Sequence, residues 1–228
     1  MNDIRALCFD LDDTLWDLAP VIPRAENALY EWYQTHCPRV TEAYTAGDIA
    51  RLRVTIATDN PGLKHDLTAL RMLTLRTIAR ETGYAEHTAT EAFRVFQAVR
   101  NSVSLFDDVL PGLTKLKVQF RLFALSNGNA NLESIGIAKF FEQSFSAREL
   151  GVAKPDVAAF NAVCERTGLA PEQIVHVGDH PENDIAAARR AGMVTIWVNR
   201  NDSDWPLHDC RPDHEVRCLE ELTEVFGV

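Results

Sequence analysis

The feature that most constrains the fold of this sequence is a series of short, largely apolar runs separated by helical patterns. The runs are Ile4–Phe9, Phe120–Leu125, Ile174–Val177 and Thr195–Val198, with a weaker one at residues 144–145. Runs of this length that end in polar loops are typical of strands buried on both faces of a parallel sheet. Because strands that alternate with helices form βαβ units, we expect an α/β fold with a Rossmann-like parallel sheet as its core.

A long helical stretch interrupts this alternation. About 110 residues separate the first apolar run from the second, far more than an ordinary crossover connection contains. The stretch contains four amphipathic helical patterns, near residues 25–33, 49–56, 67–79 and 92–103, and no convincing strand pattern. We therefore expect a four-helix cap domain at residues 16–105 and a core domain formed by residues 1–15 and 106–228. Rooted in the loop after the first strand, the cap should cover the ligand crevice.

The composition limits the partners that the chain is expected to have. It has 228 residues and a net charge of −10, with no run of Lys or Arg, so a nucleic acid backbone would be repelled. No segment approaches the roughly 20 consecutive apolar residues that a membrane span needs. We therefore expect a cytoplasmic protein that binds neither nucleic acid nor membrane, and nothing in the sequence indicates its oligomeric state.

Polar residues gather where the predicted strands end. Asp10 and Asp12 follow the first run, Ser126 and Asn127 follow the second, and Asp179 and Asp184 follow the third; Lys154 lies in a loop before a predicted helix. Each group alone also fits turn or helix-cap chemistry. Because ligands of parallel sheets bind outside the carboxyl ends of the strands, all of them together favour one shared site.

The chemistry of these residues points to phosphoryl transfer. Carboxylates of Asp10, Asp12, Asp179 and Asp184 at one edge would repel one another unless a cation lay between them. Oxygen ligands without a nearby Cys or paired His suit Mg²⁺, and we expect it as the cofactor. A carboxylate nucleophile, a divalent ion, a lysine and a hydroxyl are the parts needed for transfer through an aspartyl phosphate.

With these motifs the chain resembles the haloacid dehalogenase (HAD) superfamily, in the branch with a helical cap after the first motif. The first family motif matches residues 10–15 (DLDDTL), the second Ser126, the third Lys154, and the fourth Gly178 and Asp179 with Asp184. The resemblance covers essentially the whole chain. It implies a hydrolase that acts on a small phosphorylated metabolite.

The resemblance also implies a role for each matching residue. Asp10 would attack phosphorus, and Asp12 would protonate the leaving oxygen and then activate water. Asp10, the Asp12 carbonyl and Asp179 would hold Mg²⁺, with Asp184 in or just behind that set of ligands. The transferring phosphoryl oxygens would be bound by Ser126, Asn127 and Lys154.

Three alternative functions stay open within the same family. Members that cleave carbon–halogen bonds lack an acid two residues after the nucleophile, whereas this chain has Asp12 there; an alkoxide needs a proton to leave and a halide does not. A sugar-phosphate mutase would use the same aspartyl phosphate. A non-catalytic binding protein of the same fold is the third alternative, which the intact motifs disfavour.

The substrate is indicated only by the cap. Residues 16–29 are similar to bacterial HAD phosphatases that act on flavin mononucleotide and on a riboflavin-pathway phosphate, so we expect a flavin nucleotide or a sugar phosphate. Trp16 could stack on a planar substrate, although packing at the cap hinge also explains it. His65 could reach the substrate from the start of a cap helix, or could lie at a solvated helix start.

Overall fold

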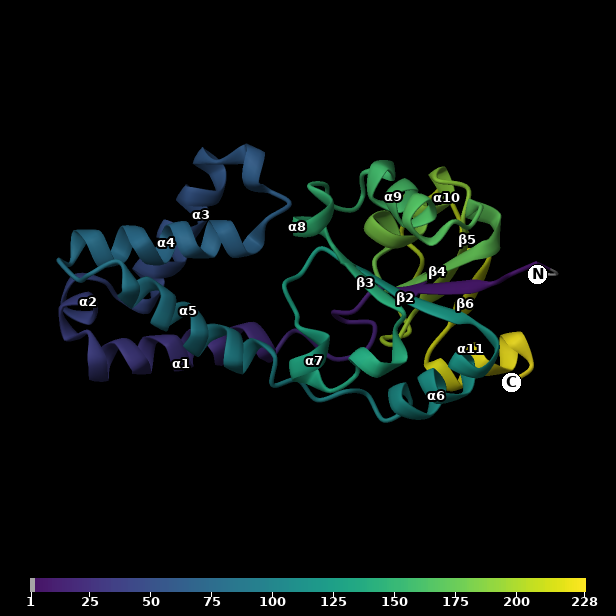
Figure 1. Ribbon diagram of the computed structural model, residues 1–228, viewed down its shortest axis with the longest axis horizontal. Helices are drawn as coiled ribbons and strands as arrows, with labels where there is room; N and C mark the ends of the chain where they lie inside the picture. The colour runs from purple at the N-terminus through teal and green to yellow at the C-terminus, as the bar shows by residue number, and fades with distance from the viewer. Residues whose placement is uncertain (1–2) are drawn as a thin grey trace. The chain divides into compact units, whose positions relative to one another are not determined.

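The computed structural model describes residues 3–228, which divide into two compact units (Figure 1). The core unit comprises the chain up to Asp17, Ser104–Gly128 and Gly136–Val228. The helical unit comprises Leu18–Val103 and Asn129–Ile135. Two units of unequal size therefore arise from a chain that passes repeatedly between them.

The core unit is built on one parallel sheet of six strands in the order β3-β2-β1-β4-β5-β6. The strands are β1 (Ala6–Phe9), β2 (Arg121–Ser126), β3 (Gln143–Ser146), β4 (Ile174–Gly178), β5 (Val194–Val198) and β6 (His214–Val216). The predicted α/β fold with a Rossmann-like parallel sheet is confirmed. The sequence patterns missed β6, because this edge strand has only three residues and two of them are exposed.

Helices cover both faces of the sheet (Figure 1). On one face, Phe160 and Val163 of α9 (Val157–Thr167) pack with Cys8 and Phe123 in a common apolar cluster, which α10 (Ala187–Arg190) joins. On the other face lie α6 (Val109–Gln119) and α11 (Leu219–Phe226). The shorter elements are η2 (Ala138–Phe140), α8 (Ala147–Leu150), η3 (Pro171–Gln173) and η4, a π-helical turn (Pro181–Ala186). Both faces are thereby removed from water, as the uninterrupted apolar strands require.

The helical unit has its own apolar core, formed by residues such as Leu29, Tyr33, Leu75, Ile78 and Phe96. Its elements are α1 (Val21–His36), α2 (Pro38–Ala43), α3 (Ala46–Asp59), η1 (Pro61–Leu63), α4 (Leu67–Glu81), α5 (His87–Arg100) and α7 (Leu132–Ile135). The four predicted amphipathic patterns correspond to α1, α3, α4 and α5. The expected count of four helices is nevertheless too low, because α2 has six residues and a single buried one, which is too short to show a helical period.

The segment Asn129–Ile135 lies far beyond residue 105 in the sequence but groups with the helical unit. Gln97 Nε2 donates to the Asn129 carbonyl at 2.7 Å, and the Asn131 N–H donates to Asn101 Oδ1 at 2.9 Å. These hydrogen bonds join the segment to α5 and to the residue that follows it. Sequence order alone does not indicate this pairing.

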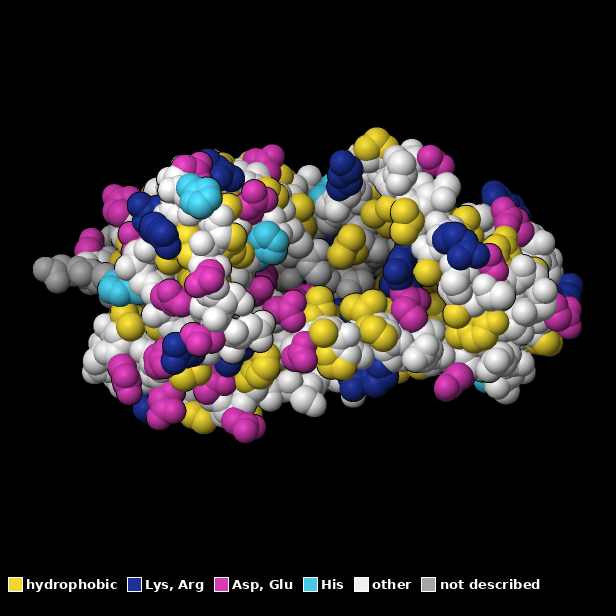
Figure 2. Space-filling view, turned by 180° about the vertical axis from the view of Figure 1, so that it is seen from behind, with side chains coloured by type: hydrophobic (Ala, Val, Ile, Leu, Met, Phe, Trp, Pro, Cys, Tyr) yellow, Lys and Arg dark blue, Asp and Glu magenta, His cyan; other side chains and the backbone are white. Residues whose placement is uncertain are grey.

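Charged side chains of both signs are interspersed on the face shown in Figure 2. Figure 2 shows Lys and Arg side chains scattered among acidic ones on the face that it presents, without a continuous basic patch. Among residues 3–228, no helix is both long enough and apolar enough to cross a membrane.

Candidate functional site

Three aspartates meet at the carboxyl ends of two neighbouring strands. Asp10 follows β1, Asp179 follows β4, and Asp184 lies in η4. The two strands pair in register, and the Asp10 N–H continues the pairing by donating to the Val177 carbonyl at 2.8 Å. One carboxylate oxygen from each aspartate lies within 4.8 Å of the others. The parallel sheet thus brings together residues that are more than 160 positions apart.

Lys154 is bonded to two of these carboxylates. Its Nζ donates to Asp10 Oδ1 and to Asp184 Oδ1, each at 2.6 Å, and the lysine side chain is only 3% exposed. Asn127 holds this residue by its backbone: Asn127 Oδ1 accepts the Lys154 N–H and Asn127 Nδ2 donates to the Lys154 carbonyl, both at 2.8 Å. The loop after β2 therefore positions the lysine.

Electrostatics in the cluster favour an added positive charge. Burial raises the pKa of Asp10 above its ordinary value, although the Lys154 ammonium opposes the shift. Burial, reinforced by the Asp184 carboxylate, raises the pKa of Asp179 to about 7. For Asp184 burial acts in the same direction, but Lys154 and His176 outweigh it and lower the pKa of this carboxyl. Three carboxylates face one ammonium, so ionising all three leaves a negative excess that a cation would relieve.

The donor set fits a hard divalent cation. All three candidate ligands are carboxylates, the oxygen donors that Mg²⁺ and Ca²⁺ prefer. Gly178 makes the approach of one of them possible, because a Cβ at this position would lie 2.4 Å from Asp184 Cγ. The absence of a side chain at Gly178 is therefore what lets Asp184 turn back toward the cluster.

The loop after β1 is fixed by hydrogen bonds from its own side chains. Thr14 Oγ1 donates to Asp179 Oδ1 at 2.9 Å. Trp16 Nε1 donates to Asp12 Oδ1, also at 2.9 Å. Asp13 adopts the left-handed conformation at φ 60°, which Asp tolerates better than most residues. The side chain of Asp12 is thereby oriented by a residue four positions later.

Trp16 corrects one of the predictions. Its side chain has no exposed surface, so it cannot stack on a planar substrate, and its indole N–H is used by Asp12. In the structure, Trp16 holds the Asp12 side chain in place within the loop after β1. The other predicted substrate contact, His65, is half-buried in the turn before α4, within the helical unit.

Ser126 ends β2, the strand next to β1 in the sheet. Its side chain is buried, and its Oγ accepts the Gly128 N–H at 2.9 Å. A hydroxyl that already accepts one hydrogen bond still has its own proton to donate. Ser126 can therefore donate to an oxyanion that reaches this edge of the sheet.

Two residues at the site were not assigned to it from the sequence. His176 lies within β4, and its Nε2 lies 3.0 Å from Asp184 Oδ1. Alternation along β4 puts His176 on the same face as Gly178, a signal that could have linked it to the site. Trp197 Nε1 donates to the Asp179 carbonyl at 2.7 Å; it comes from β5, and no local pattern marks it.

Comparisons with known proteins place the chain among hydrolases. Residues 4–192 match the family described as haloacid dehalogenase-like hydrolase. The chain is 29% identical to the 5-amino-6-(5-phospho-D-ribitylamino)uracil phosphatase YigB of Escherichia coli K12, over 99% of this chain and 98% of the relative. It is 28% identical to the human N-acylneuraminate-9-phosphatase, over 88% and 85% of the two chains.

A solved structure gives a further likeness under a different name. The crystal structure of a 2-haloacid dehalogenase from Pseudomonas syringae pv. tomato DC3000 matches with a TM-score of 0.92 and 37% identity, over 98% of both chains. The names of the relatives thus divide between two reactions, while the fold and family agree. The resemblance stated from the motifs is confirmed, and the chain belongs to the haloacid dehalogenase-like hydrolase family.

Proposed function

We propose that the chain is a Mg²⁺-dependent phosphatase that hydrolyses the phosphate monoester of a small metabolite through an aspartyl phosphate on Asp10. The observation that carries the proposal is the Asp10 carboxylate, bonded at 2.6 Å to Lys154 within a set of oxygen ligands at the end of β1. Two relatives named phosphatases, each matched over at least 85% of its length, support the same class of reaction.

The first half of the proposed reaction transfers the phosphoryl group to the enzyme. An oxygen of Asp10 forms a bond to phosphorus as the ester P–O bond breaks, and the Lys154 ammonium favours the ionised carboxylate that this attack requires. Asp12 gives its proton to the departing alcohol oxygen. In the second half, Asp12 takes a proton from the water that attacks phosphorus, and inorganic phosphate leaves Asp10.

The remaining polar groups hold the phosphoryl oxygens and the cation. Ser126 and Lys154 donate to the phosphoryl oxygens; the Asn127 amide is already bonded to the Lys154 backbone, so we assign its contact with phosphate to the backbone N–H. A Mg²⁺ ion held by Asp10, Asp179, Asp184 and the Asp12 carbonyl would offset negative charge on the transferring group. His65 is retained as a candidate contact with the rest of the substrate.

Dehalogenation is the second candidate, because of the 37% identical structure of that name. In that reaction a carboxylate displaces halide from carbon. Halide needs no proton to leave, so a proton donor at Asp12 would be unused in the step that releases it. The arrangement around Asp12 therefore favours the phosphatase.

The test compares both reactions on one preparation. Protein freed of metal with EDTA is assayed with and without Mg²⁺ on flavin mononucleotide, ribose 5-phosphate and 4-nitrophenyl phosphate, and in parallel on 2-chloropropionate. Phosphate release that needs Mg²⁺, without chloride release, is the expected result. Chloride release, or phosphate release at full rate without metal, would refute the proposal; an isomerised sugar phosphate on chromatography would reveal a mutase.

The nucleophile is tested by Asp10→Asn. An amide cannot attack phosphorus as a carboxylate does, so we expect turnover to fall by at least about 10³-fold, as for other nucleophile deletions. The fold should persist, because Lys154 keeps its bond to Asp184. Phosphate release and a melting curve are measured on the same sample, and a folded variant that retains activity would rule out Asp10 as the nucleophile.

A further inference from the structure

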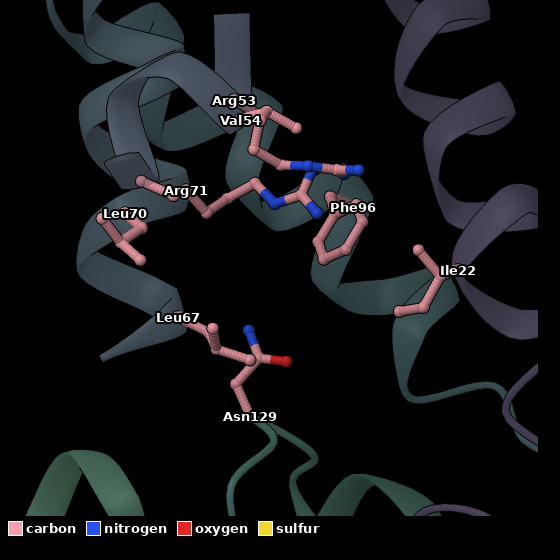
Figure 3. Close-up of a pocket in the computed structure, with 9 residues that line it drawn as sticks. Ile22, Arg53, Val54, Leu67, Leu70, Arg71, Phe96 and Asn129 are labelled. Atoms are coloured by element: carbon pink, nitrogen blue, oxygen red, sulfur yellow. The ribbon is translucent and has the colours of Figure 1, made fainter. Parts of the chain in front are cut away.

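The helical unit contains a cavity of about 310 Å³ formed by its own elements α1, α3, α4 and α5 with the residue Asn129 (Figure 3). Its wall is mostly apolar and includes Leu67, Leu70 and Phe96. Val54 and Leu67 on this wall are 63% and 47% exposed, among the few large apolar side chains that the described residues leave in water. The cavity is thus of a size and polarity common in small-molecule sites.

Two arginines enter this apolar cavity and share one carboxylate. Glu26 Oε1 accepts from Arg53 Nη1 and from Arg71 Nη1, the latter at 2.8 Å. The Arg71 guanidinium lies over the Phe96 ring (Figure 3), with its Cζ 3.6 Å from the ring centre. The side chains of Arg71 and Arg53 are 11% and 35% exposed. Arg71 is therefore held in place, and Arg53 is the more accessible cation.

The charges of these three side chains do not balance. One carboxylate neutralises one guanidinium, so the trio keeps one positive charge in a chain whose net charge is −10. Holding α1 and α4 together needs only the pair of Glu26 with Arg71. The second guanidinium, that of Arg53, adds little to the stability of the fold, because a partly desolvated cation that shares its anion is not fully neutralised.

We infer that this cavity is a binding site for a small organic oxyanion, a carboxylate or phosphate carried on an apolar or planar body. Arg53 would pair with the oxyanion through the guanidinium donors that Glu26 leaves unused, since the planar fork of arginine matches both groups. Leu67, Val54 and Phe96 would cover the apolar body. The Asn129 amide, which projects toward the same space in Figure 3, would hydrogen-bond to a polar substituent.

The origin of the ligand rests on the proposed function. If the chain hydrolyses phosphate esters, one source of the oxyanion is the alcohol part of the substrate. The substrates would then be phosphorylated acids rather than neutral sugar phosphates. A separate acid bound as an effector is the other source of the same chemistry.

Calorimetry on the full chain tests the site without using activity. The probes are 4-hydroxybenzoate and 4-hydroxybenzamide, which have the same shape and differ in charge. We expect the wild-type protein to bind the benzoate about tenfold more tightly, and Arg53→Gln to remove about tenfold of that affinity, as loss of one charged hydrogen bond would. Binding of the benzamide should change less than about twofold.

Two further variants control the experiment. Arg51→Gln is the matched control, because Arg51 lies on the same helix, is 75% exposed and pairs with Asp48 away from the cavity; it should bind both probes as the wild type does. Val54→Asp places a negative charge at an exposed position of the cavity wall, and it should weaken the binding of 4-hydroxybenzoate more than that of 4-hydroxybenzamide. This variant tests the site independently of whether Arg53→Gln folds. Equal binding of both probes, or equal losses in Arg51→Gln and Arg53→Gln, would overturn the proposal.

A kinetic experiment distinguishes whether the oxyanion is part of the substrate or a separate acid. The ratio of kcat/KM for 4-carboxyphenyl phosphate to that for 4-carbamoylphenyl phosphate is measured in the wild type and in Arg53→Gln. A tenfold fall in the ratio assigns the cavity to the substrate, and an unchanged ratio with altered calorimetry assigns it to a separate acid. If neither ester is hydrolysed, the proposed function fails while the calorimetry still decides on the cavity.

Discussion

The Asp12 carboxylate accepts a hydrogen bond from a buried tryptophan. Trp16 Nε1 reaches Asp12 Oδ1 at 2.9 Å, and the indole has no exposed surface. At the scale of the residue, the acid expected from the sequence is therefore oriented by a neighbour whose role only the structure shows.

Replacing Asp12 by Asn should separate acid chemistry from folding. The Asn oxygen can still accept the Trp16 N–H, so the melting temperature should change little, whereas kcat should fall by about 10²–10⁴-fold. The loss should be smaller for 4-nitrophenyl phosphate, whose leaving group needs little protonation. The exposed neighbour substitution Asp17→Asn is the control; losses of equal size on good and poor leaving groups would argue against Asp12 as the acid.

At the scale of the element, the end of β4 depends on a missing side chain. A Cβ at Gly178 would lie 2.4 Å from Asp184 Cγ and 2.7 Å from its Oδ2. Gly178→Ala should therefore displace Asp184, destabilise the protein by about 1–3 kcal/mol and weaken the response of activity to Mg²⁺. The control is Gly62→Ala, where an added Cβ meets nothing within 4 Å. Unchanged Mg²⁺ dependence in Gly178→Ala would contradict the placement of Asp184 in the metal site.

Another junction between elements gives a pH prediction. Arg200 binds both oxygens of Asp108 at 3.1 and 3.0 Å and also donates to the Thr14 carbonyl at 3.0 Å. The Leu219 N–H, at the start of α11, donates to Asp108 at 2.6 Å. Burial opposes ionisation of Asp108, but these hydrogen bonds outweigh it and lower its pKa below the ordinary 3.8. The ion pair of Asp108 with Arg200 thus links the loop after β1, through Thr14, to the start of α11.

A carboxyl whose pKa is depressed by folding stabilises the folded state above its unfolded pKa, and this contribution is lost as the pH falls. Asp108→Asn should cost about 1–3 kcal/mol at pH 7, and the difference from wild type should shrink as the pH falls below about 4. Unfolding by urea from pH 3 to 7 measures it. Asp107→Asn, at an exposed neighbouring position, is the control; a difference that does not vary with pH would contradict the assignment.

At the scale of the whole molecule, the cation site exists only when the core unit is folded. Its candidate ligands come from β1, β4 and η4, so an ion that binds the folded chain alone should stabilise it. At Mg²⁺ concentrations about 100 times the Kd, the stabilisation is about 2.7 kcal/mol, which corresponds to a rise in melting temperature of roughly 5–10 °C for a chain of this size.

Differential scanning fluorimetry with and without Mg²⁺ checks this expectation, with NaCl at matched ionic strength to exclude general screening. Asp179→Asn should lose most of the rise because it removes one ligand of the cluster. An equal rise in the variant, or an equal rise with NaCl, would place the ion elsewhere on this acidic chain.

The sequence by itself determined the class of fold and the residues of the acidic cluster. Apolar runs such as Ile174–Val177 form strands of the sheet, and polar residues after parallel strands share one edge in any such sheet. That is why Asp10, Asp179 and Lys154 could be grouped before the structure was known. Their distances from one another follow from strand order and register, which the local pattern alone does not specify.

Only the tertiary structure decided which neighbours support those residues. Three contacts depend on where segments of the chain pack. They are the contact of His176 with Asp184, the hydrogen bond from buried Trp16 to Asp12, and the hydrogen bonds of Asn127 to the Lys154 backbone. The pairing of Glu26 with Arg53 and Arg71 in the helical unit is of the same kind. Local periodicity specifies which face of an element is buried, whereas partners across elements are selected by packing and charge over long separations in the chain.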